Sequence, residues 1–73
     1  MSRLKKKRED KKLSQRELAE LSGVSLRMIQ HYEQGIKDIN KAHAMTVYKL
    51  SEALECDIWD ILEFDEQKKQ VEE

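Results

Sequence analysis

Two short amphipathic segments that meet at a glycine constrain this fold more than any other feature. Residues 15–34 are QRELAELSGVSLRMIQHYEQ, in which apolar side chains recur at helical spacing on both sides of Gly23. Ser14 and Glu17 form the S-x-x-E pair of a capped helix start, and Ser25 can cap a second helix. Gly23 can adopt the positive φ that a tight turn between two helices requires. The pattern predicts two consecutive helices joined by a tight turn.

The apolar residues of these two helices predict one shared core. We expect the helix before Gly23 to end at about Leu21 and the helix after it to end at Gly35. The inward side chains, spaced for one helix face, are Leu18, Ala19 and Leu21 before the glycine, and Ile29 and Tyr32 after it. Leu13 and Val24 precede the helices and can pack onto them as hydrophobic staples.

The rest of the chain predicts three more helices and no strand. A first helix is expected at residues 3–11, a fourth from about Lys41 to Glu55, and a short fifth that begins after an Asp57 cap. Asn40 is expected to cap the fourth helix, whose inward stripe is Ala44, Val47, Leu50 and Leu54. The fifth carries three inward residues, Ile58, Ile61 and Leu62. We therefore predict an all-α domain of five helices over residues 1–64, followed by a charged, frayed tail at residues 65–73.

Composition excludes several classes of protein. The single cysteine cannot form an intramolecular disulfide, which argues against a secreted, disulfide-stapled fold. No apolar run approaches the roughly 18 residues that a membrane-spanning helix needs, so we expect a soluble, cytoplasmic protein. Residues 1–41 hold 11 Lys and Arg against 6 Asp and Glu (+5), whereas residues 42–73 hold 3 against 9 (−6). This polarity indicates one face that meets an anion, although two ordinary solvated surfaces would also produce it.

The third helix leaves a polar row on its outer face. The row consists of four residues spaced i, i+3, i+4 and i+7, namely Arg27, Gln30, His31 and Gln34. Side chains of these types can hydrogen-bond base edges in the major groove of DNA. A plain solvated helix face is the alternative. Together with the two-helix pattern, the row predicts a helix-turn-helix that binds double-stranded DNA.

Residues 15–34 also resemble the helix-turn-helix of the phage Cro and lambda-repressor family, known as the xenobiotic-response-element family. The positions where that motif requires a small, glycine or apolar residue are occupied by Ala19, Gly23, Val24, Ile29 and Tyr32. The resemblance extends over roughly residues 3–62. It is carried there by five short sequence stretches: LSQRELAE, GVS, E-x-G, KDINKA and KLSEAL. It implies a lambda-repressor-like fold that lays the third helix in the major groove.

The resemblance also implies roles for single residues. The implied base-edge readers are Leu26, Arg27, Gln30 and His31, with Arg27 suited to a bidentate contact with guanine. Leu26 departs from the family, which often has a polar residue there; it could meet a thymine methyl or turn inward beside Ile29. The implied phosphate contacts are Gln15, Ser25, Gln34, Lys37, Asn40 and Lys41. Arg8 and Glu33 are expected to form a partly buried structural ion pair.

Trp59 lies outside the expected core stripe of the fifth helix. With Phe64 it is either an anchor for a dimer or partner, or a side chain that covers the acidic surface or the tail. His31 and His43 lack neighbours at metal-ligand spacing, and Cys56 has the sequence environment of a small buried apolar residue.

We find no catalytic constellation, phosphate loop or metal motif, so no enzyme activity, metal, cofactor or small-molecule ligand is expected. The sequence predicts a DNA-binding transcriptional regulator of a bacterium or phage, a repressor that binds a near-palindromic operator as a homodimer. The alternative is an interaction protein of the same fold that acts mainly through a protein partner, as an antitoxin or anti-repressor does. Trp59 and the acidic half fit that alternative.

Overall fold

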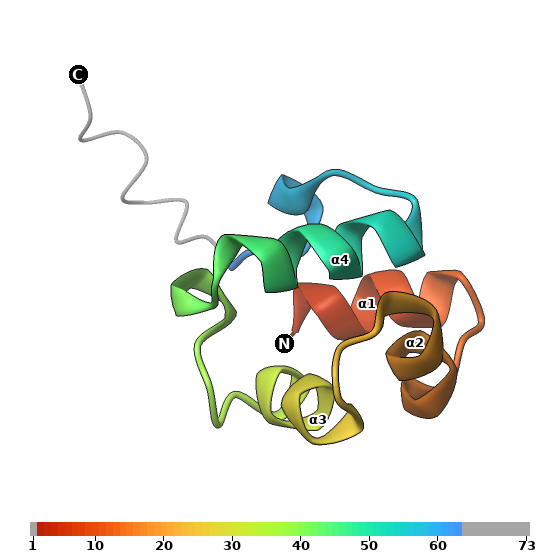
Figure 1. Cartoon of the computed structure of the whole chain (residues 1–73), viewed down its shortest axis with the longest axis horizontal. Coiled ribbons are helices and arrows are strands. Elements are labelled where there is room, and N and C mark those ends of the chain that lie inside the picture. Colours follow the sequence, from red (N-terminus) through yellow and green to blue (C-terminus); the bar gives the residue numbers. More distant parts are fainter. Residues whose placement is uncertain (1, 64–73) are drawn as a thin grey trace.

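Four α-helices and two 3₁₀ turns wrap around one core in the computed structural model, which describes residues 2–63 (Figure 1). In chain order they are α1 (Arg3–Asp10), α2 (Gln15–Ser22), α3 (Leu26–Gln34), η1 (Ile39–Lys41), α4 (Ala44–Leu54) and η2 (Ile58–Asp60). The all-α prediction is confirmed, but the expected fifth helix is the single 3₁₀ turn η2. Phe64 and the expected tail at residues 65–73 lie outside the described residues.

The start of α2 has the predicted capping box. Ser14 Oγ accepts a hydrogen bond from the Glu17 backbone N–H at 3.0 Å, and Glu17 Oε1 accepts the Ser14 N–H at 2.8 Å. At the start of α3, Ser25 Oγ accepts the Met28 N–H at 3.1 Å. These bonds satisfy backbone donors that have no partner inside the helix.

Two glycines end α2 and α3 in the left-handed conformation. Gly23 has φ +77° and Gly35 has φ +79°. A Cβ built at either position would meet no atom within 4 Å, so the backbone conformation, not space, is what favours glycine there. A side chain at such a φ costs about 1 kcal/mol. The tight turn between α2 and α3 is therefore encoded by local backbone energetics.

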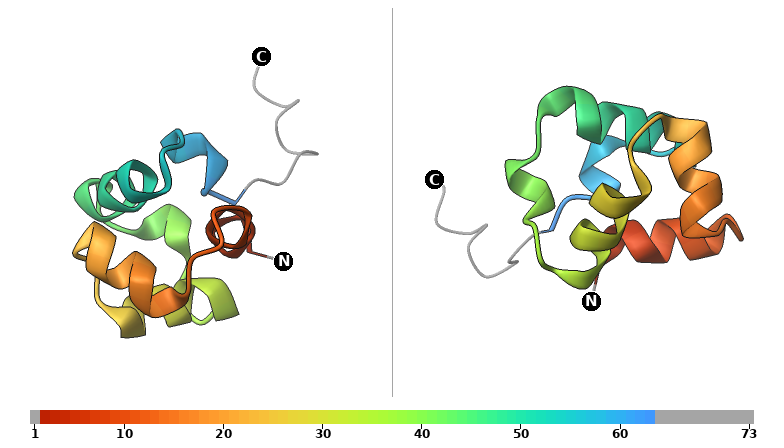
Figure 2. Two further views of the ribbon diagram at one scale, coloured as in Figure 1. Left: turned by 90° about the vertical axis from the view of Figure 1, so that its right-hand side faces the viewer. Right: turned by 60° about the horizontal axis from the view of Figure 1, so that its bottom comes forward.

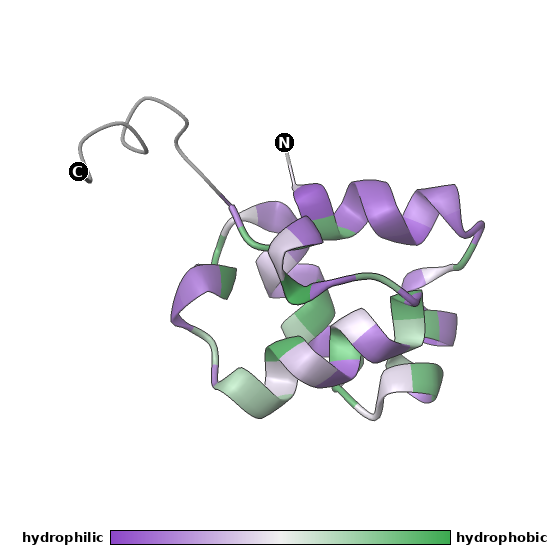
Figure 3. Ribbon diagram, turned by 90° about the horizontal axis from the view of Figure 1, so that it is seen from above, coloured by the Kyte–Doolittle hydropathy of each residue, from purple (hydrophilic) through white to green (hydrophobic). Residues whose placement is uncertain are grey.

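Every element contributes to the core. Five side chains with almost no solvent exposure come from different parts of the chain: Leu4, Leu18, Ile29, Leu50 and Ile61. α2 contacts both α3 and α4, and α1 contacts α3 and η2. Figure 2 shows this arrangement from two further sides. In Figure 3, α1 is hydrophilic along almost its whole length, since Leu4 is its one apolar residue.

The expectation that Leu21 faces the core is wrong. Its side chain is 63% exposed, and the next residue, Ser22, is buried instead. The Ser22 hydroxyl is satisfied locally, because Oγ accepts the Val24 N–H at 3.1 Å. α2 presents the side that carries Leu18, Ala19 and Ser22 to its neighbours, and small side chains there allow close approach.

The start of α4 also differs from the expectation. α4 begins at Ala44, after His43, so Asn40 does not cap it. The preceding residues form η1, whose cap is Asp38: Oδ1 of that residue accepts the Asn40 N–H at 3.0 Å. Ala44 is exposed in the first turn, and Ser51 is the additional buried residue of the stripe that Val47, Leu50 and Leu54 form.

Candidate nucleic-acid interface

The polar row of α3 is open to solvent. Arg27 and Gln34 are exposed, and Gln30 and His31 are half-buried, while Ile29 and Tyr32 on the other side of the helix are buried. The two exposed residues leave both ends of the row accessible, so the helix can approach a groove of duplex DNA, while Gln30 and His31 are partly covered by the rest of the described chain. Leu26 is half-buried at the first position of α3.

Arg8 and Glu33 form an ion pair beneath this face. Arg8 Nε lies 2.7 Å from Glu33 Oε2, and Arg8 Nη2 donates to Glu33 Oε1 at 3.0 Å. A third guanidinium bond runs from Nη1 to the Leu13 carbonyl at 2.7 Å. The Glu33 hydrogen bond raises the pKa of Arg8, and the two side chains are only 11% and 2% exposed. Arg8 therefore links α1 to α3 and is not available to a phosphate.

Gln15 extends this ion pair to the outer face of α3. Its Nε2 donates to Glu33 Oε1 at 3.0 Å, and its Oε1 accepts from Gln30 Nε2 at 3.5 Å. The polar chain thus runs from Arg8 through Glu33 and Gln15 to Gln30. Sequence analysis placed Gln15 and Gln30 separately at the interface and missed their connection, which depends on how α2 crosses α3.

The half-buried ring of His31 has one buried nitrogen. Nδ1 has no hydrogen-bond partner within the described chain. Nε2 is therefore the ring nitrogen that is left to meet a DNA base.

Two lysines flank the far end of α3. Lys37 and Lys41 are exposed on the loop that contains η1, and Ser25 and Gln34 are exposed at the two ends of α3. A hollow of about 310 Å³ separates α3 from the start of α4, and its lining includes both lysines with Met28, His43 and Thr46. Sequence analysis did not assign His43 or Thr46 to the interface. The expected start of the fourth helix at about Lys41 placed His43 inside that helix, whereas α4 begins at Ala44.

A second hollow, of about 650 Å³, lies on an acidic surface that includes no residue of α3. Its lining residues are Lys7, Ser51, Glu52, Glu55, Cys56, Asp57 and Asp60. Burial raises the pKa of the Cys56 thiol, as does the nearby carboxylate of Asp60. Within residues 2–63, no three His, Cys, Asp or Glu side chains come together as a metal site, and no helix is long and apolar enough to cross a membrane.

Trp59 is 59% exposed on η2. On α4, Met45 and Tyr48 are 59% and 50% exposed, so large apolar side chains reach the surface on both elements. The other residue expected at an interface, Phe64, lies outside the described residues.

A short α2, a glycine turn and an α3 with an open polar face together define a helix-turn-helix DNA-binding protein. Comparison with protein families agrees: a family model described as helix-turn-helix matches residues 4–58. The chain belongs to this Cro/cI-type family of DNA-binding regulators. No curated protein and no solved structure gives a match.

Proposed function

We propose that the protein is a sequence-specific transcriptional repressor that occupies an operator in bacterial or phage DNA. The observation that carries this proposal is the polar row of α3, exposed at both ends and held on a helix-turn-helix. In the cytoplasm of the bacterium, bound protein would block polymerase at the promoter.

The base contacts follow from the exposure of each side chain. Arg27 is exposed and can donate two parallel hydrogen bonds to guanine O6 and N7. Gln30 is held by Gln15, so its amide meets an adjacent base with little loss of rotamer freedom. His31 presents Nε2 to a base edge, and Leu26 offers apolar contact to a thymine methyl.

The phosphate contacts frame this row. Gln15 stands at the start of α2, where backbone N–H groups and the helix dipole favour an anion. Ser25 and Gln34 stand at the two ends of α3, and Lys37 and Lys41 continue the line beyond it. These contacts fix the register of the protein on the duplex without selecting sequence.

Two copies would bind a near-palindromic operator, with their recognition helices about 34 Å apart in successive major grooves. One α3 of 9 residues reaches only a few base pairs, so a second copy is needed for a site of useful specificity. We propose that Trp59, together with Phe64, contributes to the surface between the copies.

Replacing Arg27 by alanine tests the base contact. A random DNA pool is first selected for bound fragments, and the enriched operator is footprinted. Arg27→Ala should then weaken operator binding by roughly 1–3 kcal/mol and relax the preference at one base position. Binding is measured by fluorescence anisotropy on operator and random duplexes, with Lys49→Ala, an exposed cation of α4, as the charge-matched control. An equal loss on both duplexes would contradict base reading by Arg27.

An interaction protein that keeps this fold is the second candidate. The acidic hollow beside η2 and the exposed Trp59 favour it. Salt titration separates the two functions, because affinity for random duplex falls steeply with salt when lysines and arginines neutralise phosphates. A chain that binds no duplex at low salt would support the partner-binding function.

A further inference from the structure

Asn40 is bonded on both sides of its amide to one distant residue. Its Nδ2 donates to the Glu63 carbonyl at 2.6 Å, and its Oδ1 accepts the Glu63 backbone N–H at 2.8 Å. The side chain therefore pairs with the backbone of Glu63 as a neighbouring strand would. We call this pair of hydrogen bonds the Asn40–Glu63 clamp.

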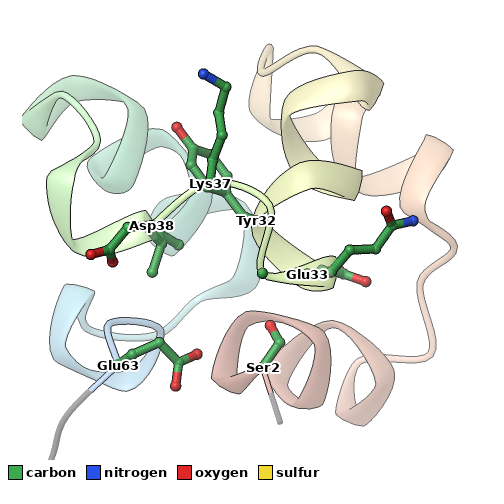
Figure 4. A pocket seen from close by; sticks show the side chains of 9 residues that line it. Ser2, Tyr32, Glu33, Lys37, Asp38 and Glu63 are labelled. Carbon is green, nitrogen blue, oxygen red and sulfur yellow. The ribbon is translucent and has the colours of Figure 1, made fainter.

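Glu63 also holds the start of α1. Its Oε2 accepts the Arg3 backbone N–H at 2.8 Å, next to Ser2, whose Oγ accepts the Lys5 N–H at 3.0 Å. Figure 4 shows Glu63 beneath the loop of Lys37 and Asp38, with Ser2 beside it and the Lys37 side chain directed away from both. Three segments that are far apart in the sequence thus meet at Glu63.

Besides the clamp, the loop is held by buried Ile39, by the Lys37 N–H bonded to the His31 carbonyl, and by the Asp38 cap of η1. Between Gly35 and His43, every residue is exposed except buried Ile39 and half-buried Ala42. This loop carries Lys37 and Lys41, the two cations next to α3. A loop without a fixed conformation must be ordered when DNA binds, and that ordering lowers the affinity.

We propose that Asn40 is a positioning residue of the DNA interface, which acts through Glu63 and does not itself contact phosphate. This inference rests on the DNA-binding function proposed above. The clamp fixes the backbone of η1, so that Lys37 and Lys41 are already placed before DNA arrives. It also couples Glu63, the last described residue, to the DNA interface.

The test compares variants that break the clamp from either side. Asn40→Ala removes both hydrogen bonds, and Glu63→Pro removes the backbone N–H that Asn40 accepts. Glu63→Ala is the matched control, because it has the charge of the proline variant but keeps the backbone N–H. Operator affinity is measured at a temperature where circular dichroism shows all variants folded.

We expect Asn40→Ala to weaken operator binding about fivefold, the effect of roughly one net hydrogen bond. Glu63→Pro should weaken it about fivefold beyond Glu63→Ala, and the double variant Asn40→Ala/Glu63→Pro should lose no more than Glu63→Pro alone. Phosphate ethylation interference should weaken at the phosphates near the loop and persist at those near α2. Losses that add in the double variant would show that Asn40 contacts DNA directly, and unchanged affinity in Asn40→Ala would show no positioning; either overturns the proposal.

Hydrogen exchange without DNA tests the clamp by itself. In Asn40→Ala, the Glu63 amide should exchange faster than in the wild-type chain, because it loses its acceptor. Unchanged exchange there would overturn the clamp even if DNA binds normally. Faster exchange in a protein that binds no duplex would support the clamp itself. It would refute the proposed DNA-binding function, and with it the positioning role of Asn40.

Discussion

Arg8 shows how one cation in a basic helix becomes part of the interior. The neighbouring Lys5 and Lys6 are exposed, whereas Arg8 is 9% exposed and uses three nitrogens in hydrogen bonds. Burying a charge is expensive unless it is paired and its donors are satisfied. The planar guanidinium can meet both Glu33 oxygens at once, which a lysine ammonium cannot do.

Removing Arg8 should destabilise the fold strongly. Arg8→Ala leaves the Glu33 carboxylate buried with only Gln15 as a side-chain partner, so we expect a loss of about 3–5 kcal/mol in the free energy of unfolding. The double variant Arg8→Met/Glu33→Leu removes both charges and should lose much less. Urea unfolding followed by circular dichroism measures both, and a single variant within 1 kcal/mol of wild type would refute a structural role for the pair.

At the scale of the element, α2 and α3 are too short to persist alone. They contain 8 and 9 residues, and isolated helices shorter than about 12 residues are marginal in water. Their caps, the packing of α2 against α3 and α4, and the packing of α3 against α1 must therefore supply the missing stability. This makes the ends of the two helices unusually important for the geometry of the interface.

The cap of α2 can be tested at a single position. Ser14→Ala should lower the free energy of unfolding by about 1 kcal/mol, because the Glu17 N–H loses its acceptor. Ser14→Asn is the matched control, because its amide oxygen can accept the same N–H, and it should cost only roughly 0.3 kcal/mol. Denaturation midpoints of the two variants give the comparison. Equal losses would mean that the capping box does not stabilise α2.

At the scale of the whole molecule, the acidic hollow and the polar face of α3 share no residue. The hollow is formed mostly by the end of α4 and by η2, and basic residues of the first 41 reach it too, since Lys7 lines it and Lys11 pairs with Glu55. Since DNA repels carboxylates, this arrangement orients the protein as it approaches the duplex.

Operator spacing tests the proposed two-copy geometry. Inserting about five base pairs between the half-sites turns them to opposite sides of the helix. We expect cooperative binding to disappear with this insertion and to return when about ten base pairs are inserted. Mobility-shift titrations report the cooperativity, and Trp59→Ala should reduce it on the original operator. Binding that ignores the spacing would show that each copy binds alone.

Much of the candidate interface could be predicted because it depends on interactions within a few residues. The Ser14 capping box, the turn at Gly23 and the polar row on α3 follow from backbone energetics and helical spacing. The Arg8–Glu33 pair was expected through a family resemblance, and the structure contains it. The base-reading and phosphate-contacting roles stay predictions that rest on the same local pattern.

Tertiary structure decided what the local pattern left open. Leu21 and Ser22 follow Leu18 by three and four residues, so both flank its face, and the apolar side chain favoured Leu21; the packing of α2 against its neighbours buries the serine instead. Asn40 is a residue type that often caps helices, yet its side chain bonds to Glu63, 23 residues away, because the fold brings residue 63 next to η1. The sequence thus determines where helices begin, turn and expose polar groups, since those energies are local. Which side is buried and which distant groups meet depends on how the helices pack.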